Sequence, residues 1–261
     1  MSPDPRSQYR FSDYAKALRE HYREFATDNE SIRYIENVAA SCEALQPRPD
    51  RFQPIEQRNF GSSMNAWHAC RGTVPTGVAS GYKGLLRIKT PFDLVLYQNL
   101  IWELRPKTIL EFGSLQGGSG LWLSDLMDTY AIDGGEVHSF DLFGKCISPL
   151  AKHPRLHFHS CNLYELQTLD DGLLSRLPHP WLVIDDAHVN VLDVTMKVDR
   201  HVQVGDYYVL EDIGLSPTIA FVEGMQKICA QGYAIDTDYA DAFGYNVTSA
   251  PNGWLRKMHR A

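Results

Sequence analysis

The sequence predicts an α/β protein built around a mostly parallel, Rossmann-like β-sheet, and three observations lead to that prediction. Residues 108–125, TILEFGSLQGGSGLWLSD, pass from a β-branched apolar run through a glycine-rich turn into apolar residues at helical spacing. Beyond them, short apolar runs alternate with helical segments towards the C-terminus. Acidic residues follow several of these runs, and the carboxyl ends of parallel strands are where such sheets bind ligands.

The composition fits a globular enzyme-sized chain and argues against several classes of protein. A formal charge of −7 over 261 residues opposes nucleic-acid binding, which favours a basic face. No run is apolar enough to span a membrane, and the polar N-terminus lacks the apolar core of a signal peptide. The five scattered cysteines form no C-x-x-C pair, as expected for reduced thiols. We therefore expect a cytoplasmic protein that binds neither nucleic acid nor membrane.

The chain is expected to have three parts: an N-terminal helical cap with a linker (1–57), a lid or substrate loop (58–90) and a catalytic domain (91–261). Residues 12–45 carry aromatic and aliphatic side chains at helical spacing, which predicts two amphipathic helices. Their role is a cap, an arm that pairs with a second copy, or packing alone. Residues 59–84 lack a period but are rich in large side chains, which suits a lid over an organic substrate or a wrap-around loop: Phe60, Met64, Trp67, His68 and Tyr82.

A helix should begin at Pro91, because Thr90 can cap it and proline is tolerated at the first helical position. Its expected buried stripe is Phe92, Val95, Leu96, Leu100 and Leu104. Parallel strands are expected at 108–112, 137–140, 156–159, 181–184 and 207–210. The last runs, 233–235 and 245–247 with 254–257, should form the antiparallel closing pair of a seven-stranded sheet.

The glycine turn distinguishes between classes of nucleotide ligand. A dinucleotide fingerprint requires G-x-G-x-x-G, and Leu115 stands where its second glycine should be. The pattern present, Glu111-x-Gly113-x-x-x-Gly117-Gly118-Ser119, resembles the first motif of S-adenosylmethionine (SAM) dependent methyltransferases. That resemblance implies an acid near the methionine ammonium group and glycines that admit the sulfonium. A tight strand-to-helix turn in an unrelated α/β protein is the alternative.

Two further positions extend the predicted nucleotide site. Asp141 follows the second strand, where an acid is placed to bind the ribose hydroxyls, although it could be a simple turn former. Asn162 follows the third strand beside Cys161 and is predicted to border the adenine pocket.

The fourth and fifth strands each end in a pair of acids, Asp185-Asp186 and Glu211-Asp212. Several carboxylates at one sheet edge repel one another unless a cation lies among them, and oxygen ligands suit Mg²⁺ or a similar divalent ion. The alternative is that these acids only cap helices. His188 follows at once, and it is either a general base for a substrate hydroxyl or a packing residue.

Taken together, the motifs resemble the cephalosporin hydroxylase family of SAM-dependent enzymes, from Tyr82 to the C-terminus. The matching runs are KTPFD (89–93), YQ (97–98), ILEFGSLQGGS (109–119), D-x-x-H (185–188), GDYYVLED (205–212) and NGWLR (252–256). The resemblance implies a class I methyltransferase fold and Mg²⁺-dependent O-methylation of small molecules. It implies metal ligands at Asp185, Glu211 and Asp212, with Asp186 beside them. The SAM-binding residues that it implies are Glu111, Gly113, Ser119 and Asp141. Further cofactor contacts are expected from Ser114, Gly117, Asn162 and Asp185. Cys161-Asn162 replaces the usual Gly-Asp pair, which leaves the adenine contacts open.

The function expected from the sequence is SAM-dependent, metal-assisted methyl transfer to a hydroxyl or carboxylate oxygen of a small molecule, in natural product biosynthesis. Asp185 and His188 are the expected catalytic residues. One alternative keeps SAM but transfers another group, or cyclises the cofactor, and releases methylthioadenosine. A second alternative is a SAM-binding protein without catalysis, which the doubled acids disfavour because a sensor needs no metal site.

Overall fold

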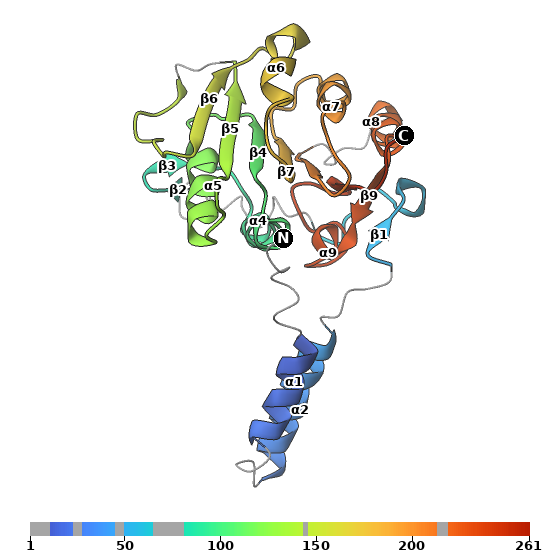
Figure 1. Ribbon diagram of the computed structural model, residues 1–261. Coiled ribbons are helices and arrows are strands. Elements are labelled where there is room, and N and C mark those ends of the chain that lie inside the picture. Colours follow the sequence, from blue (N-terminus) through green and yellow to red (C-terminus); the bar gives the residue numbers. More distant parts are fainter. Residues whose placement is uncertain (1–10, 23–27, 45–49, 65–80, 143–145, 213–218) are drawn as a thin grey trace. The chain divides into compact units, whose positions relative to one another are not determined.

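The computed structural model describes residues 11–22, 28–44, 50–64, 81–142, 146–212 and 219–261 (Figure 1). The chain divides into two compact units, Met1–Arg51 and Phe52–Ala261. The second unit begins within the segment that the sequence suggests is a linker. Within the described residues, no helix combines the length and apolar character needed to cross a membrane.

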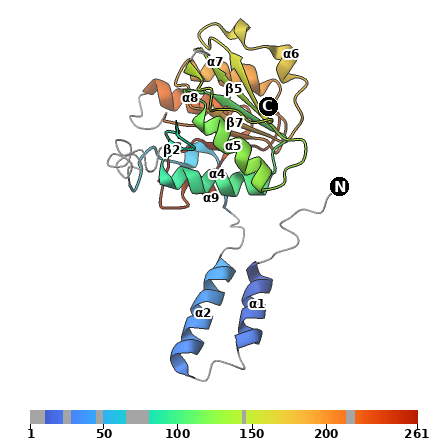
Figure 2. The ribbon, with the colours of Figure 1, turned by 90° about the vertical axis from the view of Figure 1, so that its left-hand side faces the viewer.

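The N-terminal unit is a pair of helices, α1 (Phe11–Tyr22) and α2 (Asn29–Ala44), which lie side by side (Figure 2). Ala15 and Ala39 are fully buried, so small side chains let the two helices approach closely. Arg19 Nε bonds Glu36 Oε2 across the pair at 2.9 Å. The two predicted helices are confirmed, whereas their role as a cap or a pairing arm stays a prediction.

The larger unit contains an eight-stranded sheet in the order β1-β9-β10-β8-β7-β4-β5-β6. Its parallel strands are β4 (Thr108–Phe112), β5 (Glu136–Asp141), β6 (Leu156–Ser160), β7 (Trp181–Asp185) and β8 (Tyr207–Leu210). Strand β10 (Trp254–Lys257) lies antiparallel between β8 and β9 (Tyr233–Asp236), and β1 (Phe52–Gln53) pairs with β9 at the edge. Strand order reverses between β4 and β7, so a crevice is expected at their carboxyl ends.

The predicted sheet is confirmed with two corrections at its C-terminal side. Residues 245–247 form no strand, because Asn246 adopts a left-handed conformation (φ 55°) and its side chain donates to the Gly61 carbonyl group at 2.9 Å. The closing pair is β9 and β10 alone. The sequence prediction also omitted β1, which lies in the predicted linker.

Helices α4 (Pro91–Leu104) and α5 (Gly118–Thr129) cover one face of the sheet, and α7 (Val191–Asp199) and α8 (Ile219–Cys229) the other (Figures 1 and 2). Helix α4 starts as predicted, with Thr90 Oγ1 accepting the Asp93 amide. Its buried face differs from prediction, since Tyr97 and Ile101 are fully buried while Val95 is exposed. The shorter elements are η2 (Ile55–Gln57), β2 (Gly81–Tyr82), β3 (Leu85–Leu86), η4 (Leu166–Thr168), α6 (Asp171–Leu174) and α9 (Thr237–Ala240).

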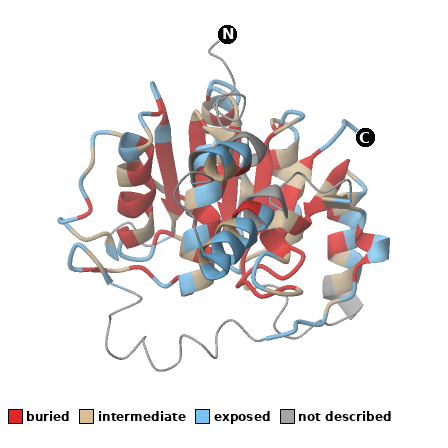
Figure 3. Cartoon of the chain, turned by 90° about the horizontal axis from the view of Figure 1, so that it is seen from below, coloured by how far each residue is buried: buried red, intermediate tan, exposed pale blue. Residues whose placement is uncertain are grey.

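The core lies between the sheet and both helix layers. Strands β4, β7 and β8 are buried along their whole length, and in Figure 3 the central strands are red while the outer sides of the helices are pale blue. Burial on both faces explains why these strands are continuous apolar runs in the sequence.

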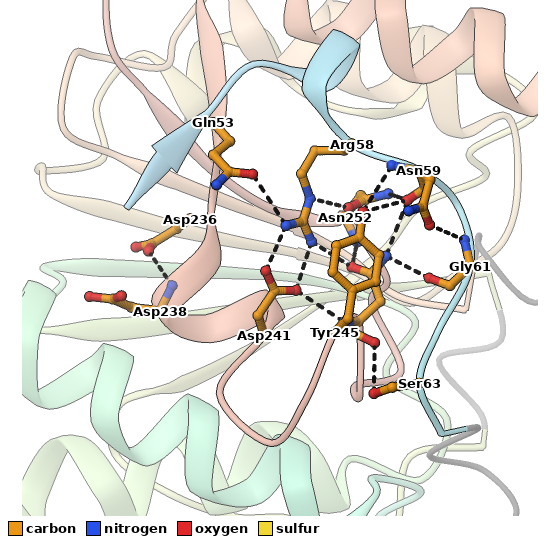
Figure 4. Close-up of polar contacts among 11 residues, drawn as sticks. Gln53, Arg58, Asn59, Gly61, Ser63, Asp236, Asp238, Asp241, Tyr245 and Asn252 are labelled. Atoms are coloured by element: carbon orange, nitrogen blue, oxygen red, sulfur yellow. Dashed lines mark hydrogen bonds and ion pairs between the residues drawn. The ribbon is translucent and has the colours of Figure 1, made fainter. Parts of the chain in front are cut away.

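A buried arginine connects the segment before residue 64 to the C-terminal loop (Figure 4). The Arg58 side chain is 2% exposed, and its two Nη atoms donate to the Asp241 carboxylate at 2.6 and 2.7 Å. Its Nε donates to Asn252 Oδ1 at 2.8 Å, and Nη2 to Asn246 Oδ1 at 3.1 Å. The guanidinium also lies 4.3 Å from the centre of the Tyr245 ring. Residues 241–252 are thereby fixed against residues 58–63.

Because Arg58 is a buried charge with a bidentate partner, replacing it by Ala should lower the free energy of unfolding by about 3–5 kcal/mol. Urea denaturation followed by circular dichroism measures this difference. The matched control is Lys83→Ala, whose ion pair with Asp125 is on the surface and should contribute less than about 1 kcal/mol. Equal losses in the two variants would contradict a special role for Arg58.

Candidate functional site

A cavity of about 590 Å³ opens at the carboxyl ends of the parallel strands. Its walls come from five places that are distant in sequence. Three of them are residues 86–88 at the end of β3, the glycine turn after β4 with Ser119, and residues 140–142 at the end of β5. The other two are residues 161–164 after β6, and residues 186–189 after β7 with Asp212 after β8. The cavity therefore lies at the strand-order reversal, where an open α/β sheet binds its ligand.

The glycine turn forms the floor of the cavity because only glycine fits its closest contacts. Gly113 has a φ of 101°, and a Cβ there would lie 2.8 Å from the Asp186 carbonyl oxygen. Gly113, Ser114 and Ser119 line the cavity. Gly117 does not line the cavity, and a Cβ at that position would lie 2.7 Å from the ring of Phe158.

Glu111 lies behind this floor and does not line the cavity. It is 1% exposed, and Ser139 Oγ donates to its Oε2. Because the Ser139 proton is used in that bond, Ser114 Oγ donates to Ser139 Oγ at 2.6 Å. Burial raises the pKa of Glu111, and the hydroxyl groups of Ser119 and Ser139 partly offset that effect. Glu111 thus orients serines that face the cavity.

The predicted ribose and adenine residues lie together on the side of the cavity formed by β5 and β6. Asp141 Oδ2 accepts the Leu115 amide at 3.0 Å, which ties the end of β5 to the glycine turn. Asn162 Oδ1 accepts the Tyr164 amide at 3.2 Å, and both residues line the cavity. Tyr164 is 74% exposed and offers an aromatic surface at the rim.

The two acid pairs are divided between the sheet interior and the cavity. Asp185 and Glu211 are each 1% exposed, whereas Asp186 and Asp212 line the cavity. Among the residues that the structure describes, Asp185 Oδ2 is buried and has no hydrogen-bond partner, and burial raises the pKa of Asp185 to about 7.

The sequence analysis did not identify Lys89 and Tyr97, which hold the buried acid of the second pair. Lys89 Nζ donates to Glu211 Oε1 at 2.7 Å and to Asp186 Oδ2 at 2.6 Å, and the Tyr97 hydroxyl donates to Glu211 Oε1 at 2.5 Å. Burial acts to lower the pKa of Lys89, but the charges of Asp186 and Glu211 raise it above its ordinary value. Lys89 is therefore a permanent cation. The sequence did carry two signals: both residues lie in runs that match the family, KTPFD (89–93) and YQ (97–98), and Tyr97 stands four residues after Asp93 on α4.

Asp186, His188 and Asp212 form a group that could hold a metal ion, with ligand atoms within 4.8 Å of one another. His188 Nε2 lies 3.3 Å from Asp186 Oδ1 and 3.6 Å from Asp212 Oδ2. The hydrogen bond with Asp186 raises the pKa of His188, and the charges of Asp212 and Asp185 add to it. His188 and Asp212 both have a φ of 56°, a conformation that is uncommon outside glycine and concentrated at functional sites.

The structure thus brings most of the predicted residues to one cavity but distributes their contacts differently. Of the predicted metal ligands, Asp212 belongs to the three-residue group, while Asp185 and Glu211 are buried next to it. Trp67 and His68 of the predicted lid lie outside the described residues. Tyr82 points to helix α5, where its hydroxyl donates to Asp125 Oδ2 at 2.8 Å.

Comparison with known proteins gives a consistent answer. The family model described as Rhamnosyl O-methyltransferase/CmcI matches residues 78–154. The rhamnosyl O-methyltransferases of Mycobacterium tuberculosis and Mycobacterium bovis are 28% identical over 196 residues, covering 67% of this chain and 76% of theirs. That of Mycobacterium leprae is 26% identical over 190 residues, covering 67% of this chain and 81% of its own.

Solved structures of CmcI are similar in both fold and sequence. The apo structure has a TM-score of 0.60 and 27% identity over 68% of this chain and 76% of its own. A structure described as the Mg-SAM form has a TM-score of 0.59 and 29% identity over the same shares. The family resemblance, the class I methyltransferase fold and the enzymatic class predicted from the sequence are confirmed. The chain is similar to the rhamnosyl O-methyltransferase/CmcI family in sequence and in fold, and it is a SAM-dependent O-methyltransferase.

Proposed function

We propose that this O-methyltransferase methylates a hydroxyl group of a small molecule with the help of a divalent metal ion. The observation that carries the proposal is a single cavity lined both by the glycine turn and by the group Asp186, His188 and Asp212. A hydroxyl is favoured over a carboxylate acceptor because the mycobacterial relatives are named for methylating a rhamnosyl group.

The residues present fit SAM. Gly113 leaves the floor without a side chain, as a closely approaching sulfonium requires, and Asp141 is the acid expected to bind ribose. Ser114, Ser119 and Asn162 supply further polar groups along the same cavity. Glu111, Gly117 and Asp185 would then act from behind this surface, through the conformation of the turn and the strand ends.

The residues present also fit a divalent ion, since two carboxylates and one imidazole present ligand atoms to one point. Such an ion lowers the pKa of a bound hydroxyl group and orients it. The resemblance to the family implies a second ligand set: Asp185, Glu211 and Asp212. We propose Asp186, His188 and Asp212 as the primary group because Glu211 Oε1 is already bonded to Lys89 and Tyr97.

The chain's own side chains account for the remaining chemistry. His188 Nε2 cannot bind the ion and accept a proton at the same time, so the two roles of His188 are alternatives. When Nε2 is free of the ion, the neutral imidazole can accept the proton of the acceptor hydroxyl, and Asp186 and Asp212 stabilise the imidazolium that results. The fixed turn aligns the acceptor oxygen with the methyl carbon and the sulfur, which is a large contribution in methyl transfer.

We also propose the finer expectations from the sequence for the rest of the chain. The N-terminal helices would pair two copies, which is consistent with the 46% exposure of Ile32 and the 70% exposure of Tyr34 on α2. The segment 58–90 would close over the acceptor, and the reaction would belong to natural product biosynthesis in the cytoplasm.

The function is tested by incubating the chain with SAM, Mg²⁺ and rhamnosides, phenols or carboxylic acids, and detecting products by mass spectrometry. We expect S-adenosylhomocysteine and a methylated hydroxyl only when acceptor and metal are present, and loss of turnover in EDTA. Methylthioadenosine formed without acceptor would contradict methyl transfer, and full turnover in EDTA would contradict the metal.

Two substitutions in the same assay separate the ligand sets. Losing a residue that only supports a metal ligand lowers metal affinity by roughly 10–100-fold. Asp186→Asn removes a proposed ligand and should therefore lower Mg²⁺ affinity by more than this. Asp185→Asn removes a neighbour of the proposed ligands and should lower it by less. The reverse order would favour the set with Asp185.

Gly113→Val should abolish SAM binding measured by calorimetry, because its side chain would enter the backbone contact with Asp186 and the floor of the cavity. Gly224→Ala in helix α8 is the control, since nothing lies within 4 Å of a Cβ at that position. Unchanged SAM affinity in folded Gly113→Val would exclude this turn as the cofactor site.

His188→Ala should lower kcat at neutral pH by about 10²–10⁴-fold if His188 is the general base. The wild-type rate should rise with pH through a pKa above 6.5, because the acidic neighbours raise the pKa of His188 and only its neutral form accepts a proton. The deficit of the variant should shrink at high pH, where the acceptor ionises unaided. If His188→Ala lost Mn²⁺ binding and its loss of kcat did not change with pH, His188 would instead be a metal ligand alone. His259→Ala is the control.

A further inference from the structure

Lys89 is a cation built into the acidic edge of the cavity. It lies just before helix α4, yet its side chain is 2% exposed. Its ammonium group contacts both acid pairs at once, Asp186 Oδ2 at 2.6 Å and Glu211 Oε1 at 2.7 Å. The proximity of buried Glu211 and partly exposed Asp186 would be unfavourable without a positive charge between them.

Within the described part of the chain, both carboxylate oxygens of Glu211 accept hydrogen bonds from protein side chains. Oε1 accepts from Lys89 and Tyr97, and Oε2 accepts from Ser249 Oγ at 3.3 Å. Each donor comes from a different part of the chain, namely the segment before α4, helix α4 itself and the C-terminal loop. Glu211 is therefore held by the fold.

Asp186 is the carboxylate that connects this ion pair to the group that could hold a metal. Its Oδ2 contacts Lys89, while its Oδ1 faces His188 at 3.3 Å. A divalent ion that used Oδ1 would share one carboxylate with the Lys89 ammonium and would be repelled by it.

We infer that Lys89 is a positioning residue that keeps the acidic edge folded without metal and weakens its affinity for the divalent ion, an inference that rests on the proposed metal site. The divalent ion can then bind and dissociate without unfolding the acidic edge, because Lys89 balances the charge of the acids when the ion is absent. Without Lys89, the fold of this edge should depend on the ion.

Lys89→Gln tests the inference through metal binding and thermal stability, with no need for an acceptor. Titration calorimetry with Mn²⁺ should show at least about tenfold tighter binding than in the wild type, because a nearby positive charge has been removed. Lys89→Arg, which keeps the charge, should stay within about threefold of the wild type. Lys83→Gln controls for the loss of a surface lysine near α5.

The melting temperature in EDTA and in Mn²⁺ gives a second measure. Lys89→Gln should melt below the wild type in EDTA and gain more from Mn²⁺ than the wild type does. Mn²⁺ binding equal to or weaker than wild type would overturn the inference. So would a variant that stays unfolded in saturating Mn²⁺. If Lys89→Gln gives these results but the wild type methylates no acceptor, the inference about Lys89 stands and only the proposed function is wrong.

Discussion

The ion pair between Lys89 and the acids that follow β7 and β8 is the interaction on which the candidate site depends. Burying a carboxylate such as Glu211 costs several kcal/mol unless a counter-charge and hydrogen bonds replace water. The chain meets that requirement from distant places: Lys89 and Tyr97 flank the start of α4, and Ser249 belongs to the C-terminal loop. That loop is itself fixed by Arg58, so a contact far from the cavity supports the geometry of its acidic edge.

The period of a β-strand explains why adjacent acids have different surroundings. Successive side chains point to opposite faces, and Asp185 pairs in register with Leu210, so Asp185 and Glu211 lie on opposite faces of the sheet. The Asp185 face carries Tyr208, and the Glu211 face carries α4. Of the four acids, Asp186 and Asp212, which follow Asp185 and Glu211, line the cavity. An acid doublet at a strand end therefore supplies one buried and one accessible carboxylate.

Local patterns predicted what local forces decide. The strand, the glycine turn and the start of α4 depend on residues a few positions apart, and each was correctly predicted. The positions of Lys89 and Tyr97 depend on Glu211, more than a hundred residues away, and the contact of Arg58 with Asp241 spans 183 residues. At Asn246, contacts with distant residues made a prediction from the local pattern wrong. Its apolar neighbours suggested a strand, but side-chain bonds to residues 59–61 fix a turn instead.

The glycine turn and the acidic edge of the cavity meet in one backbone contact. The Asp186 amide donates to the Phe112 carbonyl group at 2.9 Å, which continues the pairing of β4 with β7, and the Asp186 carbonyl oxygen then closes over Gly113. A shift of the glycine turn would move Asp186, and with it its contacts with Lys89 and with His188. If SAM and the acceptor bind as proposed, the pairing of β4 with β7 would help to fix the methyl donor relative to Asp186, and alignment of that kind contributes strongly to catalysis.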